Sequence, residues 1–167
     1  MHITTNSYKE LFQSNKKTFS NYFYKNFGLR IGNCEAYFLA FIHSSAEIKN
    51  DSGKFVNNER LEYLGDAILD SIVSDYLFSL YPDKKEGFLT QMRSKIVSRD
   101  SLNEIASKMN INKLLVAKLE TDKYRYIGGN TLEAIIGAIY KEKGYRRTKK
   151  ILIKRIIEKY LDINKLV

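Results

Sequence analysis

The sequence predicts a single-domain, all-α fold. Apolar residues recur at helical steps of three and four in its most regular segment, and no convincing alternation of apolar and polar residues calls for a sheet. A single proline and nine glycines leave long stretches that can form uninterrupted helices. With 167 residues and 44% apolar side chains, the chain can bury about 70% of the surface that it exposes when unfolded.

Each expected helix carries apolar side chains and is bounded by residues that favour breaks or caps. Gly28 and Gly32 end the first segment, and Asn58 is the expected N-cap of the longest helix. Pro82 lies beyond the end of that helix, and Gly144 separates the last two helices. The expected helices cover residues 8–27 (one or two helices), about 35–43, 58–81, about 87–110 (one or two, broken near 98–100), about 130–143 and about 145–160, with polar connections at 44–57 and 111–128.

The net charge of +9 favours a polyanionic partner, although on its own it proves little. Residues 141–167 hold ten Lys or Arg against three Asp or Glu. This basic segment is either a solvated helix face or a nucleic-acid contact, and the sequence leaves both open.

Cysteine usage and the N-terminus favour a cytoplasmic protein. Cys34 is the single cysteine, so it cannot form an internal disulfide, and its apolar neighbours predict a small core residue. The longest apolar run, residues 36–42, is too short to span a membrane. The first residues have neither the basic start nor the apolar core of a signal peptide.

The most informative segment places three carboxylates on one face of a helix. Glu59, Glu62 and Asp66 are spaced by three and four residues, where like charges repel by a few tenths of a kcal/mol per pair. A bound cation would offset this repulsion, and Mg²⁺ prefers such oxygen ligands. A solvated face is the plainer alternative, but a broad apolar stripe in the same segment argues for a buried helix. Gly65 in its middle predicts a close approach of another backbone.

Four segments, in order, closely resemble the motifs of the ribonuclease III family. The signature N-E-R-L-E-F-L-G-D-(A/S)-(V/I)-L is matched by residues 58–69, NERLEYLGDAIL. His43-Ser44-Ser45 resembles the upstream T-H-x-S segment. Residues 86–97 resemble the E-G-x-L-(T/S) helix, and residues 129–140 resemble G-D-x-x-E-A-(L/I)-I-G-A-(I/V)-(Y/F).

The resemblance implies a helical endonuclease domain over residues 31–162. Residues 1–30 would be an N-terminal helical segment of the same domain, and residues 163–167 a C-terminal tail. Family members usually carry a separate double-stranded-RNA-binding domain beyond this point, where the present sequence ends. Without it, affinity for RNA is expected to be low and strongly salt-dependent.

The activity implied by the resemblance is Mg²⁺-dependent hydrolysis of double-stranded RNA, with Mn²⁺ as the substitute ion. A homodimer would face one RNA duplex with two sites and make staggered cuts that leave 5′-phosphate and 3′-hydroxyl ends. The processing of ribosomal and messenger RNA precursors is the expected role. The alternative is a catalytically weak or inactive relative that binds structured RNA or a ribonucleoprotein.

The resemblance also assigns the site residues. Glu62 and Glu133 are the expected metal ligands, and Asp66 would ligate the metal and orient or deprotonate the attacking water. Asp66 and Glu133 are thus the expected catalytic residues, with Glu59 in support. Asn130 stands where the family has an aspartate. It would hold the metal through its amide oxygen, with weaker affinity because one negative charge is lost.

Two further alternatives stay open in the sequence. Asn130 and Glu133 also fit a capping box, in which Asn130 would begin a helix and Glu133 would reach back to it. Aromatic residues near the signature would serve either a dimer seam or the core, and core packing is the expected role for most of them. These residues are Tyr63, Phe78, Tyr81 and Phe88.

Overall fold

The computed structural model describes residues 7–31, 35–119 and 124–166. These residues form helices and no strand, with only isolated bridges between extended residues, which confirms the all-α prediction. The helices are α1 (Tyr8–Phe27), α2 (Glu35–Leu39), η1 (Ser44–Ala46), α3 (Glu59–Leu80), α4 (Glu86–Ile96), α5 (Arg99–Lys108), η2 (Ile111–Lys113), α6 (Tyr124–Leu152), the π-helix η4 (Ile153–Ile157), α7 (Glu158–Tyr160) and η5 (Ile163–Lys165).

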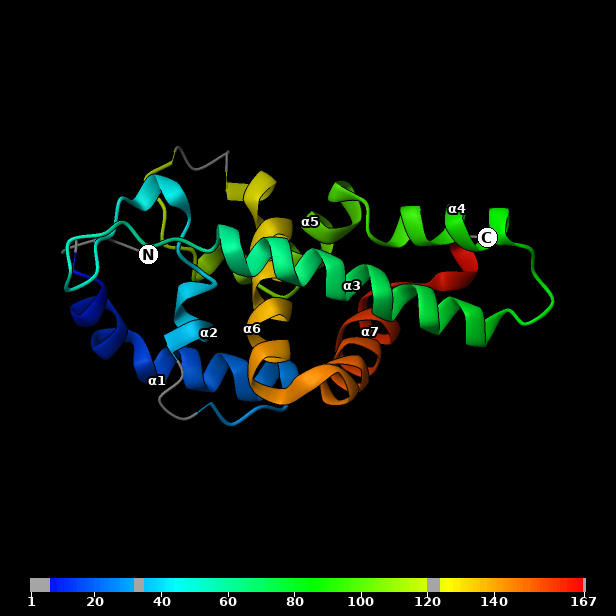
Figure 1. The fold of residues 1–167 in the computed structure, drawn as a ribbon, viewed down its shortest axis with the longest axis horizontal. Coiled ribbons are helices and arrows are strands. Elements are labelled where there is room, and N and C mark those ends of the chain that lie inside the picture. Colours follow the sequence, from blue (N-terminus) through cyan, green and yellow to red (C-terminus); the bar gives the residue numbers. More distant parts are fainter. Residues whose placement is uncertain (1–6, 32–34, 120–123, 167) are drawn as a thin grey trace.

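Helix α3 runs along the length of the molecule and crosses α6, against which it packs most extensively (Figure 1). Helices α1 and α2 lie at one end, and α4 runs beside the other half of α3 (Figure 1). Helix α5 packs against α6. The crossing of α3 and α6 therefore lies in the middle of the fold, with the signature segment at it.

Two glycines allow the backbones of α3 and α6 to touch at this crossing. A Cβ atom on Gly65 would lie 1.7 Å from the carbonyl oxygen of Glu133, and one on Gly137 would lie 2.3 Å from that of Leu61. No side chain fits such distances. The expected close approach at Gly65 is thus confirmed, and the neighbouring backbone belongs to the residue that carries an expected metal ligand.

The N-terminal end of the fold is packed by aromatic rings. Phe19 on α1 stands edge-on to Phe38 at 5.1 Å and to Phe41 at 4.9 Å between ring centroids. Each of these rings is almost fully buried. Edge-on pairs of this kind add about 0.5–1.5 kcal/mol beyond the burial of their apolar area. They fix α1 and the α2 segment as one body.

Several expected boundaries are confirmed. Residues 8–27 form one helix, and Gly28 caps it in the left-handed conformation with a φ of 67°. Helix α3 ends at Leu80, before Pro82. The expected break near residues 98–100 separates α4 from α5, where the Ser98 hydroxyl accepts a hydrogen bond from the amide of Ser101.

Two expected boundaries are wrong. Helix α2 ends at Leu39 rather than near residue 43, because Ile42 leaves the helix to form a parallel bridge with Val116. Helix α6 begins at Tyr124, six residues before the expected start. Gly128 and Gly129 look like a turn in the sequence, but they lie inside α6, where side chains of α5 and η2 leave no room for a Cβ on Gly128.

Gly144 marks the expected break, but the helical chain resumes directly after it. Its φ of 71° and ψ of 172° are a conformation that only glycine adopts readily, and they bend the helix there. The expected last helix then continues through the π-helix η4 to Tyr160. The expectations for Gly32 and Cys34 lie outside the described residues. Within the described ranges, no helix combines the length and apolarity that crossing a membrane requires.

Candidate functional site

The first turns of α3, the start of α5 and the first half of α6 enclose a pocket of about 420 Å³. It contains every candidate site residue expected from the sequence. The lining residues are Glu59, Glu62, Tyr63, Asp66, Val97, Arg99, Leu102, Gly129, Asn130 and Glu133. The carboxylates of α3 and α6, some 70 residues apart in the chain, therefore share one cavity.

Helix α3 begins where it was expected, but the capping contact differs from the prediction. The buried side chain of Asn58 donates to the carbonyl oxygen of Ala40 at 3.1 Å and makes no cap. Asn57 Oδ1 instead accepts a hydrogen bond from the amide of Glu59 at 3.2 Å. Asn58 thus ties the start of α3 to the end of the α2 segment, and this fixes where the carboxylates of the first turns lie.

Asn130 lies in the second turn of α6, so the capping-box interpretation is wrong. Its side-chain nitrogen Nδ2 donates a hydrogen bond of 2.7 Å to Glu62 Oε1 on α3. Position 130 therefore faces the carboxylate pocket. An amide at this position satisfies a neighbouring carboxylate, which a second carboxylate could not do without a cation between them.

The pKa of Glu133 is raised to about 7. Burial is the main cause, and the negative charges of Asp66 and Glu62 add to it. The pKa of Glu62 is also raised, again mainly by burial and then by the charge of Glu59. These carboxylates repel one another in the absence of a cation, which is the electrostatic condition that a metal ion relieves.

Sequence reasoning missed Arg99, whose positive charge lowers the pKa values of both Glu62 and Glu133 against the larger effects that raise them. Arg99 is the first residue of α5, where the positive end of the helix dipole disfavours a cation. A cation at this unfavourable position was the signal in the sequence, because a nearby group of carboxylates would compensate for its repulsion by the helix dipole. Arg99 leaves a positive charge at the wall of an otherwise acidic pocket.

Asp70 was also missed, because the family motif has its last carboxylate at Asp66. Its charge raises the pKa of Glu133, although it is the smallest of the causes. Its Oδ1 is buried and has no hydrogen-bond partner among the described residues. Asp70 lies one helical turn after Asp66 and extends the carboxylate row of α3 toward the interior.

Asp66 and Glu59 are exposed, whereas Glu62, Asn130 and Glu133 are half-buried. The exposed carboxylates therefore meet solvent and any incoming ligand first. Among the described residues, no three His, Cys, Asp or Glu side chains stand close enough to form a ready-made metal cage. The pocket supplies oxygen donors from both helices, which fits Mg²⁺, because this ion binds through one or two carboxylates and keeps several waters.

His43, from the upstream motif, does not line the pocket. Its Nδ1 lies 2.9 Å from Ser45 Oγ and accepts a hydrogen bond from the amide of Ser45, which caps η1. Burial lowers the pKa of His43, and the charge of Glu59 partly opposes this. The motif therefore has a structural role in holding the loop that leads toward α3.

The aromatic residues near the signature divide into two pairs. Tyr81 and Phe88 meet edge-on with ring centroids 5.1 Å apart and pack against the core. Tyr63 and Phe78 on α3 are 82% and 71% exposed. Core packing thus holds for two of the four, and the other two offer apolar area to a partner.

Comparison with known proteins gives one consistent relationship. A family model described as Ribonuclease-III-like matches residues 33–160. Ribonuclease 3 of Azobacteroides pseudotrichonymphae is 45% identical over 156 residues, which make up 93% of this chain and 60% of that protein. Ribonuclease 3 of Bacteroides fragilis is 42% identical over 157 residues, or 93% of this chain and 54% of that protein. The chain spans between about half and three fifths of these relatives.

The fold is shared with a nuclease domain of ribonuclease III from Campylobacter jejuni. That structure matches with a TM-score of 0.73 and 32% identity, and covers 84% of this chain and 96% of its own. It is described as showing structural flexibility in a region involved in dimer formation. A second crystal structure of that domain matches equally well, at 30% identity.

Proposed function

Because the chain belongs to the ribonuclease-III-like family, we propose that it is a metal-dependent endoribonuclease that hydrolyses phosphodiester bonds in double-stranded RNA. One observation carries the proposal. Glu62, Asp66 and Glu133 share a pocket that also holds the cation Arg99, so the charges needed for phosphodiester hydrolysis are gathered in one place. The expected products are RNA fragments with 5′-phosphate and 3′-hydroxyl ends.

Glu62, Asp66 and Glu133 would hold Mg²⁺ or Mn²⁺, together with the amide oxygen of Asn130. When bound, the ion makes a water molecule a stronger nucleophile and neutralises charge at the scissile phosphate. This assignment is supported by the half-buried positions of Glu62 and Glu133 and by the repulsion between their charges. A bound cation would lower the free-energy cost of both the burial and the repulsion. The amide of Asn130 must release Glu62 Oε1 or rotate before its oxygen can face the ion.

The chain's own groups would each have one task in the reaction. Asp66 is exposed at the pocket, and one of its carboxylate oxygens would accept the proton of the attacking water. Arg99 would attract a phosphate oxygen and disperse the negative charge that grows on it. Glu59, on the exposed rim, would support the site by adding negative charge beside Glu62, which favours a bound cation.

The family assignment further supports a homodimer whose two pockets each cut one strand, which would produce the staggered ends. Phe78 supports it, because aromatic side chains are enriched at protein interfaces and this ring on α3 is 71% exposed. Phe78 borders a cavity of about 710 Å³ between α3 and α4, in which Phe78 and Leu89 are the apolar residues of an otherwise polar lining. This surface is the proposed dimer seam.

A second function has one specific observation in its favour. Asn130 removes a carboxylate from the site and engages Glu62. A chain with a weakened metal site would bind structured RNA and cut it slowly.

For both functions, the proposed setting is the cytoplasm, and the proposed RNA ligands are precursors of ribosomal or messenger RNA.

The deciding experiment incubates the chain with an end-labelled RNA duplex and Mg²⁺. Cleavage is expected with Mg²⁺ or Mn²⁺, none is expected with EDTA, and the single strand alone should stay intact. The Glu133→Gln variant is the matched control for a contaminating nuclease. Cleavage that persists in EDTA or in this variant would reject the proposed site, and binding without cleavage would favour the second function.

A further inference from the structure

A second cavity, of about 620 Å³, lies between the segment after Gly144 and the end of α1. Six of the described residues that line it are cationic, none is acidic, and the others are apolar residues and a glycine. These cations form what is here called the basic face: Lys143, Arg146, Arg147, Lys150, Lys154 and Arg155.

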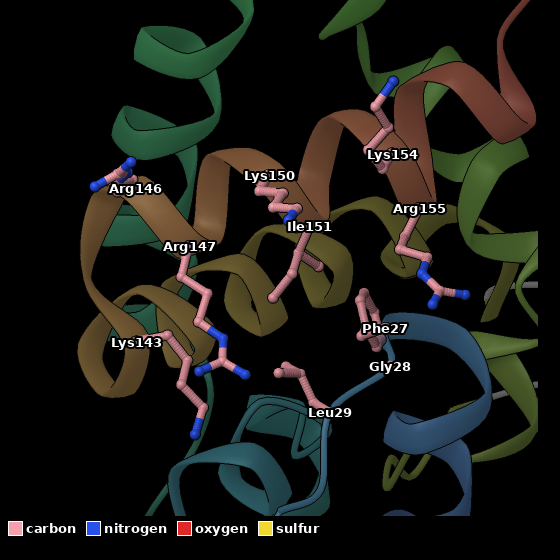
Figure 2. A pocket seen from close by; sticks show the side chains of 10 residues that line it. All are labelled: Phe27, Gly28, Leu29, Lys143, Arg146, Arg147, Lys150, Ile151, Lys154 and Arg155. Atoms are coloured by element: carbon pink, nitrogen blue, oxygen red, sulfur yellow. The ribbon is translucent and has the colours of Figure 1, made fainter.

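The basic face surrounds an apolar floor made of Phe27, Leu29 and Ile151 (Figure 2). In Figure 2, Lys143 and Arg147 lie on one side of this floor and Arg155 lies on the other, against the end of α1. An apolar floor lowers the local dielectric and strengthens the field of the surrounding cations. The cavity is therefore built to attract negative charge.

Most of these cations form no ion pair with a described residue, although the charge of Arg147 contributes to lowering the pKa of Glu142. Lys143 is paired with Glu142, and Lys154 with Glu158. Within the described residues, the other four make no ion pair: Arg146, Arg147, Lys150 and Arg155. Like charges three or four residues apart on a helix cost a few tenths of a kcal/mol per pair. An anion that binds here would remove this cost.

The backbone is irregular at both ends of the basic face. Gly144 precedes most of its cations with a bend that only glycine allows readily. The π-helix Ile153–Ile157 contains Lys154 and Arg155 and widens the last turns, which changes the direction of their side chains. Helices of this type are rare and occur often at functional sites. Two costly local features thus set the position of one set of positive charges.

From these observations we propose that the basic face binds the phosphate backbone of RNA as a second contact, separate from the pocket where cleavage is proposed. On the helical segment after the bend at Gly144, Arg146 and Arg155 are nine residues apart, or about 13 Å along the helix. A nucleic-acid strand in a duplex carries one charge per about 3.4 Å, so it can neutralise cations along this whole length. A compact phosphate ester would leave several of them unpaired.

The two cavities share no lining residue. Glu133 lies on α6 before the bend at Gly144, and all but Lys143 of the basic face follows it. The contact would thus add affinity without touching the reacting phosphate. The proposal rests on the proposed function only in taking RNA as the ligand, and binding can be measured without cleavage.

The test compares the wild type with an Arg147→Gln/Lys150→Gln double variant in EDTA, using a fluorescent RNA duplex at several salt concentrations. Both residues are exposed and unpaired among the described residues, so the fold should be kept. The expected result is a Kd about tenfold higher at physiological salt. The slope of log Kd against log salt should fall by about 2, because two phosphate contacts are lost.

A Lys9→Gln/Lys17→Gln variant on α1 is the control, because it removes the same charge from exposed positions outside the basic face. Equal weakening by both double variants would mean that only net charge matters, and would overturn the proposal. An unchanged Kd in the first variant, or no RNA binding by the wild type, would do the same.

Two further measurements keep the outcomes apart. Inorganic tripolyphosphate serves as a competitor, and its displacement of RNA at stoichiometric amounts would assign the basic face to a compact phosphate ligand instead. Cleavage with Mg²⁺ at saturating RNA should be equal in wild type and variant. Weakened binding in the variant, together with no cleavage by either protein, would uphold the second contact and reject the nuclease proposal.

Discussion

The side-chain amide of Asn130 on α6 donates a 2.7 Å hydrogen bond to Glu62 Oε1 on α3. This contact joins the two helices that supply the carboxylates of the pocket. It provides a neutral donor to an oxygen whose other neighbours include the negative charges of Glu59 and Asp66. Asn130 thus stabilises the metal-free pocket, and it lacks the charge that would favour a cation.

Asn130→Asp should shift this balance toward the metal-bound protein. The new carboxylate would face Glu62 at hydrogen-bonding distance, so the Tm in EDTA should fall. The Mg²⁺ concentration for half-maximal cleavage should decrease about tenfold, which corresponds to about 1.4 kcal/mol of added metal interaction. Cleavage at graded Mg²⁺ concentrations and thermal unfolding with and without Mg²⁺ measure the two effects.

Asn130→Ala is the matched control, because it removes the hydrogen bond and adds no charge. It should lower the Tm in EDTA without lowering the Mg²⁺ requirement. If Asn130→Asp leaves the Mg²⁺ dependence unchanged, position 130 does not contribute to metal binding.

Asp66→Asn and Glu133→Gln should each reduce the rate of cleavage by at least about 10²-fold, because each removes a charge assigned to the chemical step. Both substitutions keep side-chain volume, so folding and duplex binding in EDTA should be retained. Single-turnover cleavage measures the loss of rate, and circular dichroism checks that folding is retained. Glu10→Gln, on the exposed surface of α1, is the control and should cut at the wild-type rate.

The stability of the metal-free protein should depend on the protonation of Glu133. Its pKa is about 7 when folded and 4.5 in the absence of the fold, so the folded state holds this proton more tightly. The stabilisation of the folded state by this bound proton is complete below about pH 4.5 and is lost as the pH rises to 7. The free energy of unfolding of Glu133→Gln, relative to wild type, should therefore rise over this interval.

Urea unfolding of both proteins at several pH values in EDTA measures this difference in unfolding free energy. The contributions of other titrating groups, such as His43, are common to both proteins and cancel. Added Mg²⁺ should raise the stability of the wild type above pH 7, because the ion binds the deprotonated carboxylate. Parallel curves for the two proteins would contradict the raised pKa.

Gly65→Ala should destabilise the fold by about 3 kcal/mol or more, because its Cβ would overlap the carbonyl of Glu133 and neither backbone can rotate away. Gly87→Ala in α4 is the control, since a Cβ there meets no atom within 4 Å. It should leave the stability unchanged or raise it by up to about 1 kcal/mol. Equal midpoints of urea unfolding for both variants would contradict the backbone contact.

Phe78→Glu should convert the proposed dimer to a monomer, because it replaces an exposed aromatic ring of the proposed seam with a negative charge beside Asp75 and Glu86. Sedimentation at micromolar concentration measures the mass, and paired cuts in a duplex should become single nicks. Tyr24→Glu removes another exposed ring, near the end of α1 and outside the proposed seam, and should leave the mass unchanged. A wild-type monomer that still makes paired cuts would reject the shared-duplex arrangement.

The sequence predicted best where local signals and packing agree. Helix α3 has its expected bounds because the apolar stripe and Pro82 act together, and Gly65 was interpretable because a mid-helix glycine has a cost that needs a reason. The start of α6 was missed because Gly128 and Gly129 also suit a turn. Only their contact with α5, which is distant in sequence, distinguishes the two cases.

The site residues also divide into those with a local signal in the sequence and those that depend on contacts between distant segments. Glu59, Glu62 and Asp66 were found by their spacing and Glu133 by the motif, and all four line one pocket. Which group Asn130 contacts depends on how α3 crosses α6, and this crossing is not encoded in either segment alone. Arg99 required knowing that α5 begins there and that its first turn faces the acidic pocket.

The glycine crossing of α3 and α6 has a consequence for how this protein can diverge. The distance between the carboxylates of the two helices is set by backbone meeting backbone at Gly65 and Gly137, with no side chain between them. Core side chains elsewhere can therefore change in size, as they do when a protein adapts to a new growth temperature, while this separation stays the same. The distance between the charged groups is thus kept when the residues of the core change.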